Sequence, residues 1–329
     1  MSTFRAYAVD HEDESTPDGI RELTLEALGD DEVTIRVEWS SVNYKDALAA
    51  SPKGRVARIS PLIPGIDLAG EVIESTSPEI AAGQRVLAHG YDLGVSHHGG
   101  FSELARVPAG WVVPLPNGLT AKEAMAIGTA GYTAALCVVA LEERGLTPGD
   151  GEVLVLGASG GVGSVAVSIL AGRGYTVAAV TGKPEQADLL RGLGAAEIIA
   201  RDEVTADGKP LERERWAGCV DAVGGAPLAY ALRTLRYGAS VASCGNVAGG
   251  DLHTTIFPFI LRGVSLLGID SSQTPIVRRR EIWNRLGDDL GPALDDSLVR
   301  EVTLDGVGLV LAELLAGGGV GRTVVDVRG

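Results

Sequence analysis

The sequence predicts an α/β protein that combines a doubly wound parallel sheet with a β-rich, partly open barrel-like domain. Between residues 152 and 269, strand-like and helix-like runs alternate, as they do in βα units of a parallel sheet. Before residue 124, short β-prone runs are joined by Gly and Pro instead. The tail, 302–327, has the pattern strand, helix, strand, and we expect it to return to the first domain.

The β-rich domain is built from short strand-like segments. One of them, VTIRVEWSSV, alternates polar and apolar residues as a half-buried strand does. Thr120 is placed to cap a helix that Gly128 and Gly131 interrupt. We predict a first domain from 1–124 and 300–329 and a second from 125–299. The expected strands are 21–26, 33–42, 68–74, 84–89 and 101–107, and the helix is 121–144.

The second domain opens with a glycine-rich turn between a strand and a helix. The run EVLVLGASGGVG ends in glycines, and 158, 160 and 163 read A-x-G-x-x-G, followed by a helix-like segment and a second strand, 175–180. Gly160 lets the main chain approach a pyrophosphate, and Gly163 lets the helix pack on the strand. Free N–H groups at the helix start attract phosphate. We therefore predict a Rossmann-type dinucleotide site. The sheet continues with strands at 197–200, 219–223, 240–244 and 264–269 and helical segments at 189–193 and 228–235.

The end of the second strand favours NADP(H) over NAD(H). NAD sites usually carry Asp or Glu about 20 residues after the glycines. Here Thr181, Gly182 and Lys183 hold that place, and Arg201 follows the next strand. A lysine and a hydroxyl suit a 2′-phosphate, which a carboxylate would repel. The alternative is that Lys183 and Arg201 are ordinary surface charges.

Composition and charge limit the partners and the compartment that the protein can have. The chain has 43 acidic and 28 basic residues and a formal charge of −15, so nucleic acid and anionic membranes are poor partners. Its length, 329 residues, is enough for two domains with sizeable cores. No charged leader or membrane-spanning run is apparent. Cys137, Cys219 and Cys244 are widely spaced, which fits reduced thiols in the cytoplasm.

Several long segments together resemble one superfamily across essentially the whole chain. The order of a β-rich domain, GTAGYTA, GASGGVG and a returning tail is similar to the medium-chain dehydrogenase/reductases. More narrowly, the chain resembles their acryloyl-CoA reductase branch, often labelled quinone oxidoreductase. The resemblance implies a GroES-like catalytic domain (1–124 and 300–329), a Rossmann NADP-binding domain (125–299) and a homodimer formed through the edge of the latter. The segments that carry it are WSSVNYKDALA, PGIDLAGEV, IGTAGYTAALCVVALE, FPFILRGVSLLGIDS and GRTVV.

The positions that hold zinc in zinc-dependent relatives carry other residues here. Asn43 stands where those relatives have Cys, and Ile66-Asp67 where they have His-Glu. Neither an amide nor isoleucine supplies the thiolate or imidazole that zinc needs. His97-His98 is the only histidine pair in the sequence. Adjacent loop histidines without a third ligand more often face solvent than bind a metal. We predict no metal.

Without a Lewis acid, the substrate must already be a good hydride acceptor, as an α,β-unsaturated thioester is. Hydride transfer to the β-carbon leaves an enolate, which needs hydrogen-bond donors and then a proton. Asn43, Tyr44 and Asp46 follow a strand end, where we expect a loop, and the resemblance puts that loop against the nicotinamide. Tyr44 is the candidate donor or proton relay, Asn43 orients substrate or cofactor, and Asp46 and Asp67 support them. The alternative is that Asn43 and Tyr44 only cap the strand end.

The resemblance assigns further positions to the coenzyme. Thr129 matches a position that lines the nicotinamide, and Asn246, Ile260 and Ser271 match contacts of the nicotinamide half. Arg322 is a cation that either pairs with Asp67 or Asp46 or touches substrate phosphates. The pyrophosphate turn is matched by Ser159, Gly160, Gly161 and Val162.

A basic run bears on the acyl carrier. Between Asp46 and Asp67 the chain has no carboxylate, but it carries Lys53, Arg55 and Arg58. Such a run beside the cleft would attract the phosphates of a CoA ester, although basic loop residues are often only solvated. The sequence thus predicts an NADPH-dependent reductase of 2-enoyl thioesters, with acryloyl-CoA the favoured substrate. The alternatives are a quinone or small enone reductase, and a non-catalytic NADPH-binding redox sensor.

Overall fold

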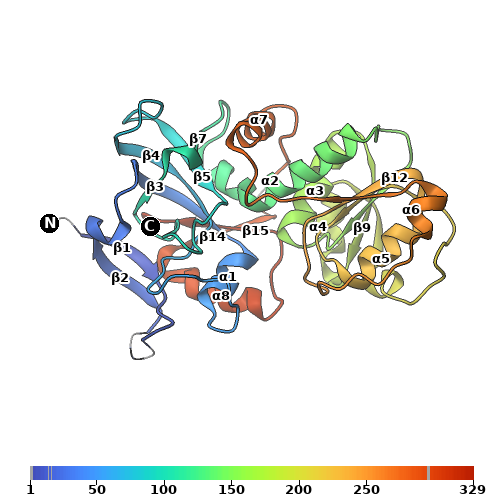
Figure 1. Cartoon of the computed structure of the whole chain (residues 1–329), viewed down its shortest axis with the longest axis horizontal. Coiled ribbons are helices and arrows are strands. Elements are labelled where there is room, and N and C mark those ends of the chain that lie inside the picture. Colours follow the sequence, from blue (N-terminus) through green and yellow to red (C-terminus); the bar gives the residue numbers. More distant parts are fainter. Residues whose placement is uncertain (1–2, 14, 16, 295–296) are drawn as a thin grey trace. The chain divides into compact units, whose positions relative to one another are not determined.

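The computed structural model describes residues 3–13, 15, 17–294 and 297–329. The chain forms two compact units (Figure 1). The first comprises Met1–Thr129, Ser272–Asp288 and Asp296–Gly329, and the second Ala130–Ser271 and Asp289–Asp295. The predicted fold class is confirmed: one unit is β-rich and the other holds a parallel sheet.

The first unit is built on a seven-stranded sheet with a separate two-stranded hairpin. The sheet order is β14-β15-β3-β4-β5-β7, and β6 pairs with β3. In the first half of β3, Val33, Ile35 and Val37 are buried in the core of this unit, as the polar–apolar alternation predicts, whereas all three residues of Ser40–Val42 are buried. The strands are β1 (Thr3–Ala8), β2 (Gly19–Thr24), β3 (Val33–Val42), β4 (Asp67–Ser75), β5 (Arg85–His89), β6 (Leu104–Val107), β7 (Val112–Pro114), β14 (Val299–Thr303) and β15 (Arg322–Asp326).

The tail returns to the first unit, as predicted. It contains β14, α8 (Val307–Leu315) and β15, and β15 pairs antiparallel with β3. The register sets Thr323 opposite Val42. Arg322 therefore comes level with Asn43, at the end of β3. This register joins residues 279 positions apart in the sequence.

The segment after β3 is a helix, and the predicted loop is wrong. Helix α1 (Tyr44–Ala50) begins directly after Asn43, its N-cap residue. The Asp46 carboxylate accepts a hydrogen bond from the Asn43 N–H at 2.7 Å, which satisfies a helix-end donor. Asn followed by Asp three positions later, before an Ala-Leu run, was a sequence signal for this helix. Figure 1 shows α1 beside α8, against which it packs.

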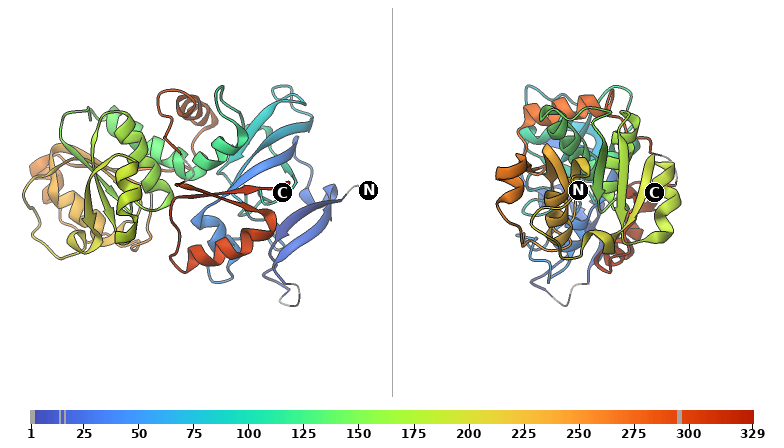
Figure 2. Two further views of the ribbon diagram at one scale, coloured as in Figure 1. Left: turned by 180° about the vertical axis from the view of Figure 1, so that it is seen from behind. Right: turned by 90° about the vertical axis from the view of Figure 1, so that its right-hand side faces the viewer.

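The second unit holds a six-stranded parallel sheet of order β10-β9-β8-β11-β12-β13. Helices cover both faces of this sheet (Figure 2), which confirms the doubly wound prediction. Its strands are β8 (Glu152–Leu156), β9 (Thr176–Thr181), β10 (Ala195–Ala200), β11 (Trp216–Asp221), β12 (Leu235–Ser243) and β13 (Ser265–Gly268). Its helices include α3 (Gly161–Gly172), α4 (Ala187–Gly192), α5 (Gly225–Thr234) and α6 (Phe257–Arg262).

One segment differs from the predicted division of the chain. Residues 272–288 were assigned to the second domain, but they cluster with the first unit and contain α7 (Ile276–Leu286). The reason is packing: Arg279 and Trp283 are fully buried and hydrogen-bond to His89 at the end of β5. No strand or glycine pattern in the sequence indicates these long-range contacts.

Helix α2 (Ala121–Glu143) contains the boundary between the units and is kinked at Gly128. The Glu123 N–H donates to the Thr120 hydroxyl at 3.2 Å, which confirms the predicted cap. Among the described residues, α2 is the one helix long and apolar enough to cross a membrane. Because 89% of its most apolar window is buried inside the protein, it has the character of a core helix.

Candidate active site and nucleotide-binding residues

The predicted residues of the first unit converge on the carboxylate of Asp67, at the start of β4. Asp67 is fully buried and accepts hydrogen bonds from the hydroxyls of Ser41 and Thr129, each at 2.5 Å. The Asn43 Nδ2 donates to it at 2.7 Å. Such a carboxylate is stable without water because each oxygen is met by donors. Asp67 therefore fixes the orientation of Asn43 and Thr129, which lie 24 and 62 positions away.

Arg322 completes this cluster. Its side chain is 2% exposed and donates to the Ala126 carbonyl at 2.9 Å, to the Ser41 hydroxyl at 2.9 Å and to Asn43 Oδ1 at 3.3 Å. Its guanidinium lies 3.9 Å from Asp67. Burial lowers the pKa of Arg322, and the nearby carboxylates oppose that shift. Of the two predicted roles for Arg322, the buried ion pair with Asp67 is the one found.

Gly128 makes the close approach possible. Its φ is +52°, and a Cβ there would lie 2.6 Å from Arg322 Nη2 and 2.7 Å from Asp67 Oδ2. No side chain fits without displacing the ion pair. Gly128, which the sequence predicts only as an interruption of a helix, is required by the cluster beside it.

Asp46 is also fully buried, and its carboxylate binds backbone N–H groups. Its carboxylate accepts from the N–H groups of Gly65 at 3.2 Å and Ile66 at 2.8 Å, in addition to Asn43. Burial, followed by repulsion from Asp67, raises the pKa of Asp46 to about 7. Asp46 thus supports the Asn43 backbone and the turn before β4, as the predicted supporting role requires.

Tyr44 differs from its neighbours because it faces outward. The side chain is 45% exposed, and within the described ranges its hydroxyl has no hydrogen-bond partner. Lys45, for which the sequence predicts no role, is half-buried and donates to the Ser272 hydroxyl at 2.8 Å. Tyr44 therefore presents a hydroxyl that is available to a ligand.

The basic run follows α1 directly. Lys53, Arg55 and Arg58 are all exposed, and none of them forms an ion pair with any described residue. Arg55 has a φ of +52°, an uncommon conformation for a residue with a side chain. Three exposed cations without an ion-pair partner in the described part of a chain of charge −15 form a local positive surface.

In the second unit, the glycine turn is shaped as a phosphate site requires. A Cβ at Gly163 would lie 2.2 Å from the Gly157 carbonyl, so only glycine lets α3 start so close to β8. Gly160 is the N-cap of α3, and Gly161 and Val162 form its first turn. Gly160 makes no side-chain hydrogen bond to the first turn of α3, which fits a pyrophosphate at this helix start.

The end of β9 combines paired hydroxyls with cations. The Thr181 hydroxyl donates to Ser159 Oγ at 3.0 Å and accepts from the Lys183 N–H at 3.0 Å. The Thr181 hydrogen is thus used inside the protein. The Arg201 guanidinium lies against Gly182, where a Cβ would come within 2.8 Å of it. The structure thus brings Arg201 and Gly182 together at the end of β9, where Thr181 is buried against Ser159.

The other three residues predicted to contact the coenzyme lie on segments of the second unit other than β9. Asn246 is exposed and its carbonyl accepts from the Gly249 N–H at 2.9 Å, Ile260 is 64% exposed on α6, and Ser271 is half-buried. Sequence reasoning missed Asp221, which ends β11 and accepts from the Gly224 N–H at 2.9 Å and the Ser243 hydroxyl at 2.6 Å. An acid followed by AVGG at a strand end was the available signal.

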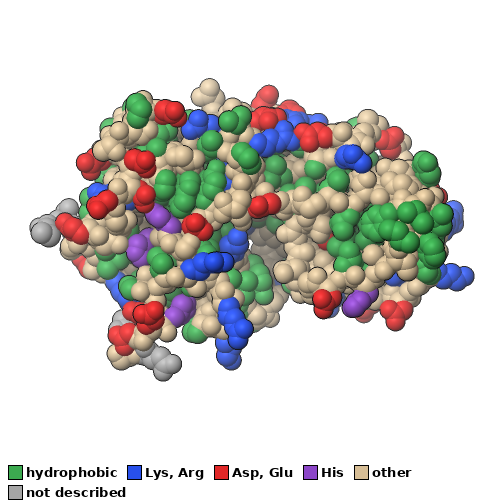
Figure 3. All heavy atoms as spheres, in the orientation of Figure 1, with side chains coloured by type: hydrophobic (Ala, Val, Ile, Leu, Met, Phe, Trp, Pro, Cys, Tyr) green, Lys and Arg blue, Asp and Glu red, His purple; other side chains and the backbone are tan. Residues whose placement is uncertain are grey.

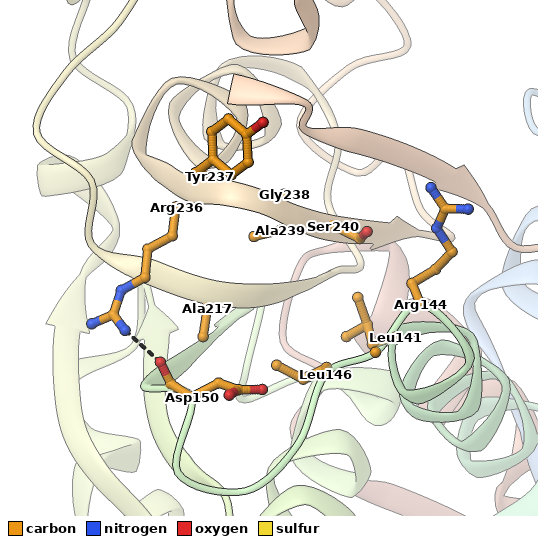
Figure 4. Close-up of a pocket in the computed structure, with 11 residues that line it drawn as sticks. Leu141, Arg144, Leu146, Asp150, Ala217, Arg236, Tyr237, Gly238, Ala239 and Ser240 are labelled. Carbon is orange, nitrogen blue, oxygen red and sulfur yellow. Dashed lines mark hydrogen bonds between the residues drawn. The ribbon is translucent and has the colours of Figure 1, made fainter. Parts of the chain in front are cut away.

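A separate pocket of about 290 Å³ lies in the second unit (Figure 4). It is lined by the last turn of α2 and the start of β12, and it contains none of the predicted site residues. The two arginines on its wall point away from one another: Arg236 hydrogen-bonds to the Asp150 carbonyl and Arg144 to Ser265. The pocket thus lacks convergent polar groups and carries no functional argument.

Comparison with known proteins identifies the family. Residues 29–117 match the alcohol dehydrogenase GroES-like domain and residues 161–285 the zinc-binding dehydrogenase domain. The acrylyl-CoA reductase AcuI of Ruegeria pomeroyi is 51% identical, over 99% of each chain. The chain belongs to the medium-chain dehydrogenase/reductase superfamily. Within it, the chain falls in the acryloyl-CoA reductase and quinone oxidoreductase-like branch, so the resemblance seen in the sequence is confirmed.

Solved structures place this medium-chain reductase among nucleotide-bound relatives. Escherichia coli K-12 YhdH, with bound NADPH, has a TM-score of 0.91 and 43% identity, and the match covers all of both chains. The Bacillus subtilis protein YhfP, with NAD bound, has a TM-score of 0.95 and 46% identity, covering 99% of this chain and all of that one. YhfP is named a putative quinone oxidoreductase. Coenzymes of both phosphorylation states thus occur among the relatives.

The residues of this reductase do not fit the zinc that the family model's name implies. The Ile66 side chain has no atom that could coordinate a metal, and the Asn43 amide is hydrogen-bonded to Asp67 and Arg322. Within the described part of the chain, no group of three or more His, Cys, Asp or Glu is arranged to hold a metal ion. Thiolate and imidazole ligands are the donors that zinc sites of this kind use. That the protein works without metal stays a prediction.

Proposed function

We propose that this protein reduces the C=C bond of an α,β-unsaturated acyl-CoA with NADPH, and that acryloyl-CoA is converted to propanoyl-CoA. The observation that carries the proposal is at α1: an exposed tyrosine hydroxyl is followed by a run of exposed cations, and among the described residues neither has a hydrogen-bond or ion-pair partner. The similarity to acrylyl-CoA reductase AcuI across the whole chain supports it. An acyl-CoA offers an oxygen for the hydroxyl and phosphates for the cations.

The coenzyme is proposed to lie on the glycine turn and the end of β9. Ser159 and the N–H groups of Gly161 and Val162 would hold the pyrophosphate. Lys183 and Arg201 would hold the 2′-phosphate, because guanidinium and ammonium groups make charge-assisted hydrogen bonds to it. When bound, NADPH supplies a hydride to the β-carbon of the substrate.

The protein's own part in the reaction is to stabilise charge on the thioester oxygen. The Tyr44 hydroxyl is free to donate there, and a donor aimed at a developing oxyanion lowers the barrier. Asn43 is held by Asp67 and Arg322, so its amide cannot rotate to follow the substrate. Its role is to keep the N-terminus of α1, and with it Tyr44, in one position. The enolate then takes a proton from solvent, for which the Tyr44 hydroxyl is the relay, at its α-carbon, and this completes the reaction.

Steady-state turnover with NADPH tests this proposal most simply. Acryloyl-CoA should be reduced with a higher kcat/KM than crotonyl-CoA, and a quinone should be a poor substrate. Preferred reduction of the quinone would favour the alternative function, quinone reduction, after which the relative YhfP is named. Absence of turnover with all three would favour the redox sensor. Elemental analysis of the same preparation should find no stoichiometric zinc, and a chelator should leave the rate unchanged.

We infer further that the protein is a homodimer. Strand β13 lies at the edge of its sheet and pairs only with β12 among the strands described. Figure 3 shows hydrophobic side chains gathered over the region of α6, and exposed apolar residues there include Ile256, Ile260 and Leu261. An open strand edge flanked by apolar side chains suits pairing with a second copy. The three free thiols fit a cytoplasmic enzyme.

A further inference from the structure

A buried chain of hydrogen bonds runs from α7 to the Asp67 carboxylate, through a histidine that the proposed reaction does not use. His89 ends β5, directly opposite Asp67 in the antiparallel register, and is 1% exposed. Trp283 Nε1 lies 2.7 Å from His89 Nε2, and His89 Nδ1 lies 3.2 Å from the Thr129 hydroxyl. Thr129 in turn donates to Asp67 at 2.5 Å.

The direction of each bond follows from the chemistry of the groups. An indole nitrogen can only donate, so His89 Nε2 must accept from Trp283. In a neutral ring, the hydrogen then sits on Nδ1 and points at the Thr129 oxygen. Because the Thr129 hydrogen is used on Asp67, its oxygen is the acceptor from His89. All three bonds therefore point toward the Asp67 carboxylate.

Burial and a neighbouring buried arginine together keep this histidine neutral. Arg279 Nη1 lies 3.0 Å from both ring nitrogens of His89 and donates to the His89 carbonyl at 2.9 Å. Its second Nη donates to the Ser272 carbonyl at 3.0 Å. Burial, followed by the charge of Arg279, lowers the pKa of His89 well below its usual value. A second proton on the ring would face both this guanidinium and the indole N–H.

We propose that His89 is a positioning residue for the active site, which fixes the Thr129 hydroxyl as a donor to Asp67 and so leaves it able only to accept from any further partner. Thr129 then orients the Asp67 carboxylate through its hydroxyl and its N–H, which lies 3.0 Å from Oδ2. The same carboxylate oxygen holds Asn43, the N-cap of α1. His89 thus acts on the position of Tyr44 without touching a ligand.

Two amide variants separate the two hydrogen bonds of the ring. In His89→Asn the short amide places an N–H near the former Nδ1, so the donor to Thr129 is kept. In His89→Gln the longer amide places its oxygen near the former Nε2, so the acceptor for Trp283 is kept and the donor is lost. We expect His89→Asn to retain kcat within about threefold and His89→Gln to lose about 5- to 30-fold, the usual scale for one hydrogen bond. Equal losses that follow the thermal stability of the two variants would overturn the positioning role.

A double-mutant cycle shows whether the effect passes through Thr129. In a Thr129→Val background the hydroxyl is gone, so His89→Gln should cause no further loss of kcat. Additive losses would contradict the proposal.

The tautomer is read without any substrate, which separates this inference from the proposed function on which its kinetic part rests. Long-range ¹H–¹⁵N correlation spectra of histidine-labelled protein at pH 7, assigned with His89→Asn, should show a neutral ring with its hydrogen on Nδ1. A hydrogen on Nε2, or a charged ring, would overturn the inference whatever the enzyme reduces. A correct tautomer in a protein that does not reduce acyl-CoA would overturn only the proposed function.

Discussion

The two sides of helix α1 differ in how their polar groups are satisfied. On the buried side, Asn43 and Asp46 are at most 9% exposed and are held by Asp67, Arg322 and backbone N–H groups. On the other side, Tyr44 is 45% exposed and has no partner in the described chain. Groups with protein partners fix geometry, and groups without them are available to a ligand. Substitutions on the buried side should therefore change stability, and those on the exposed side should change catalysis.

Removal of Arg322 should have the largest effect on folding. Arg322→Met leaves the Asp67 charge buried without its cation and should lower the free energy of unfolding by about 3–5 kcal/mol. Arg328, whose side chain is 56% exposed and 3.7 Å from Glu38, is the matched control. Arg328→Met should cost about 0–1 kcal/mol, as surface pairs do. Urea denaturation of both variants measures the difference, and similar losses would remove the contrast between buried and exposed charges.

Asp46, on the buried side of α1, should also make the free energy of unfolding depend on pH. The pKa of Asp46 is raised from 3.8 to about 7 by burial and by Asp67, so the folded protein binds a proton that the unfolded chain releases. Its stabilising contribution is full below about pH 4 and is lost as pH rises through about 7. Between about pH 4 and pH 7, the free energy of unfolding of the wild type should therefore fall by a few kcal/mol relative to that of Asp46→Asn. Above about pH 7 the difference between the two proteins should stay constant. An opposite trend would mean that the three N–H donors outweigh burial and hold Asp46 ionised.

The end of β9 repeats the contrast on a smaller scale. Thr181 is buried and paired with Ser159, whereas Arg201 is exposed against Gly182. If Lys183 holds the 2′-phosphate together with Arg201, Lys183→Ala should weaken NADPH binding by about 1–3 kcal/mol and leave NADH binding unchanged. Fluorescence titration with both coenzymes measures this. A wild type that prefers NADH, or equal losses for the two coenzymes, would remove the basis for the NADP(H) assignment.

The basic run should have the smallest effect for each residue. Each of Lys53, Arg55 and Arg58 is exposed, so its attraction for a phosphate is worth about 0.5 kcal/mol, or roughly tenfold for all three together. Neutralising them with glutamine should raise KM for acryloyl-CoA by that factor and weaken its salt dependence. A small neutral enone has no phosphate, so its kcat/KM serves as the control. Equal losses with both substrates would make the run structural.

The sequence predicted the framework because periodicity and glycine spacing are local signals. The six parallel strands, the glycine turn and the returning tail all follow from such patterns, and β3 was predicted with its observed bounds, Val33–Val42. Helix α1 was missed because seven residues after a strand resemble a loop unless the Asn43–Asp46 cap is recognised. Helix α7 was missed for another reason: its place in the first unit depends on contacts of Arg279 and Trp283 with His89, which no local pattern indicates.

The cluster around Asp67 could be predicted only in part. Its members came from motifs, but their pairing depends on a strand register that joins the tail to β3. Ser41 and His89 were missed because a serine in a strand and a lone histidine carry no signal by themselves. The role of Arg322 stayed open for a physical reason: the same cation suits a buried ion pair or a phosphate, and burial alone separates the two.

The central claim is that Tyr44, the one side chain of this cap that faces outward, donates a hydrogen bond to the substrate oxygen in the transition state. Tyr44→Phe keeps the ring and removes only that donor. Single-turnover hydride transfer to acryloyl-CoA from bound NADPH should slow by about 10²–10³-fold, with the free energy of unfolding and the NADPH affinity unchanged. A rate within a few-fold of wild type would show that Tyr44 only shapes the pocket and would contradict the account.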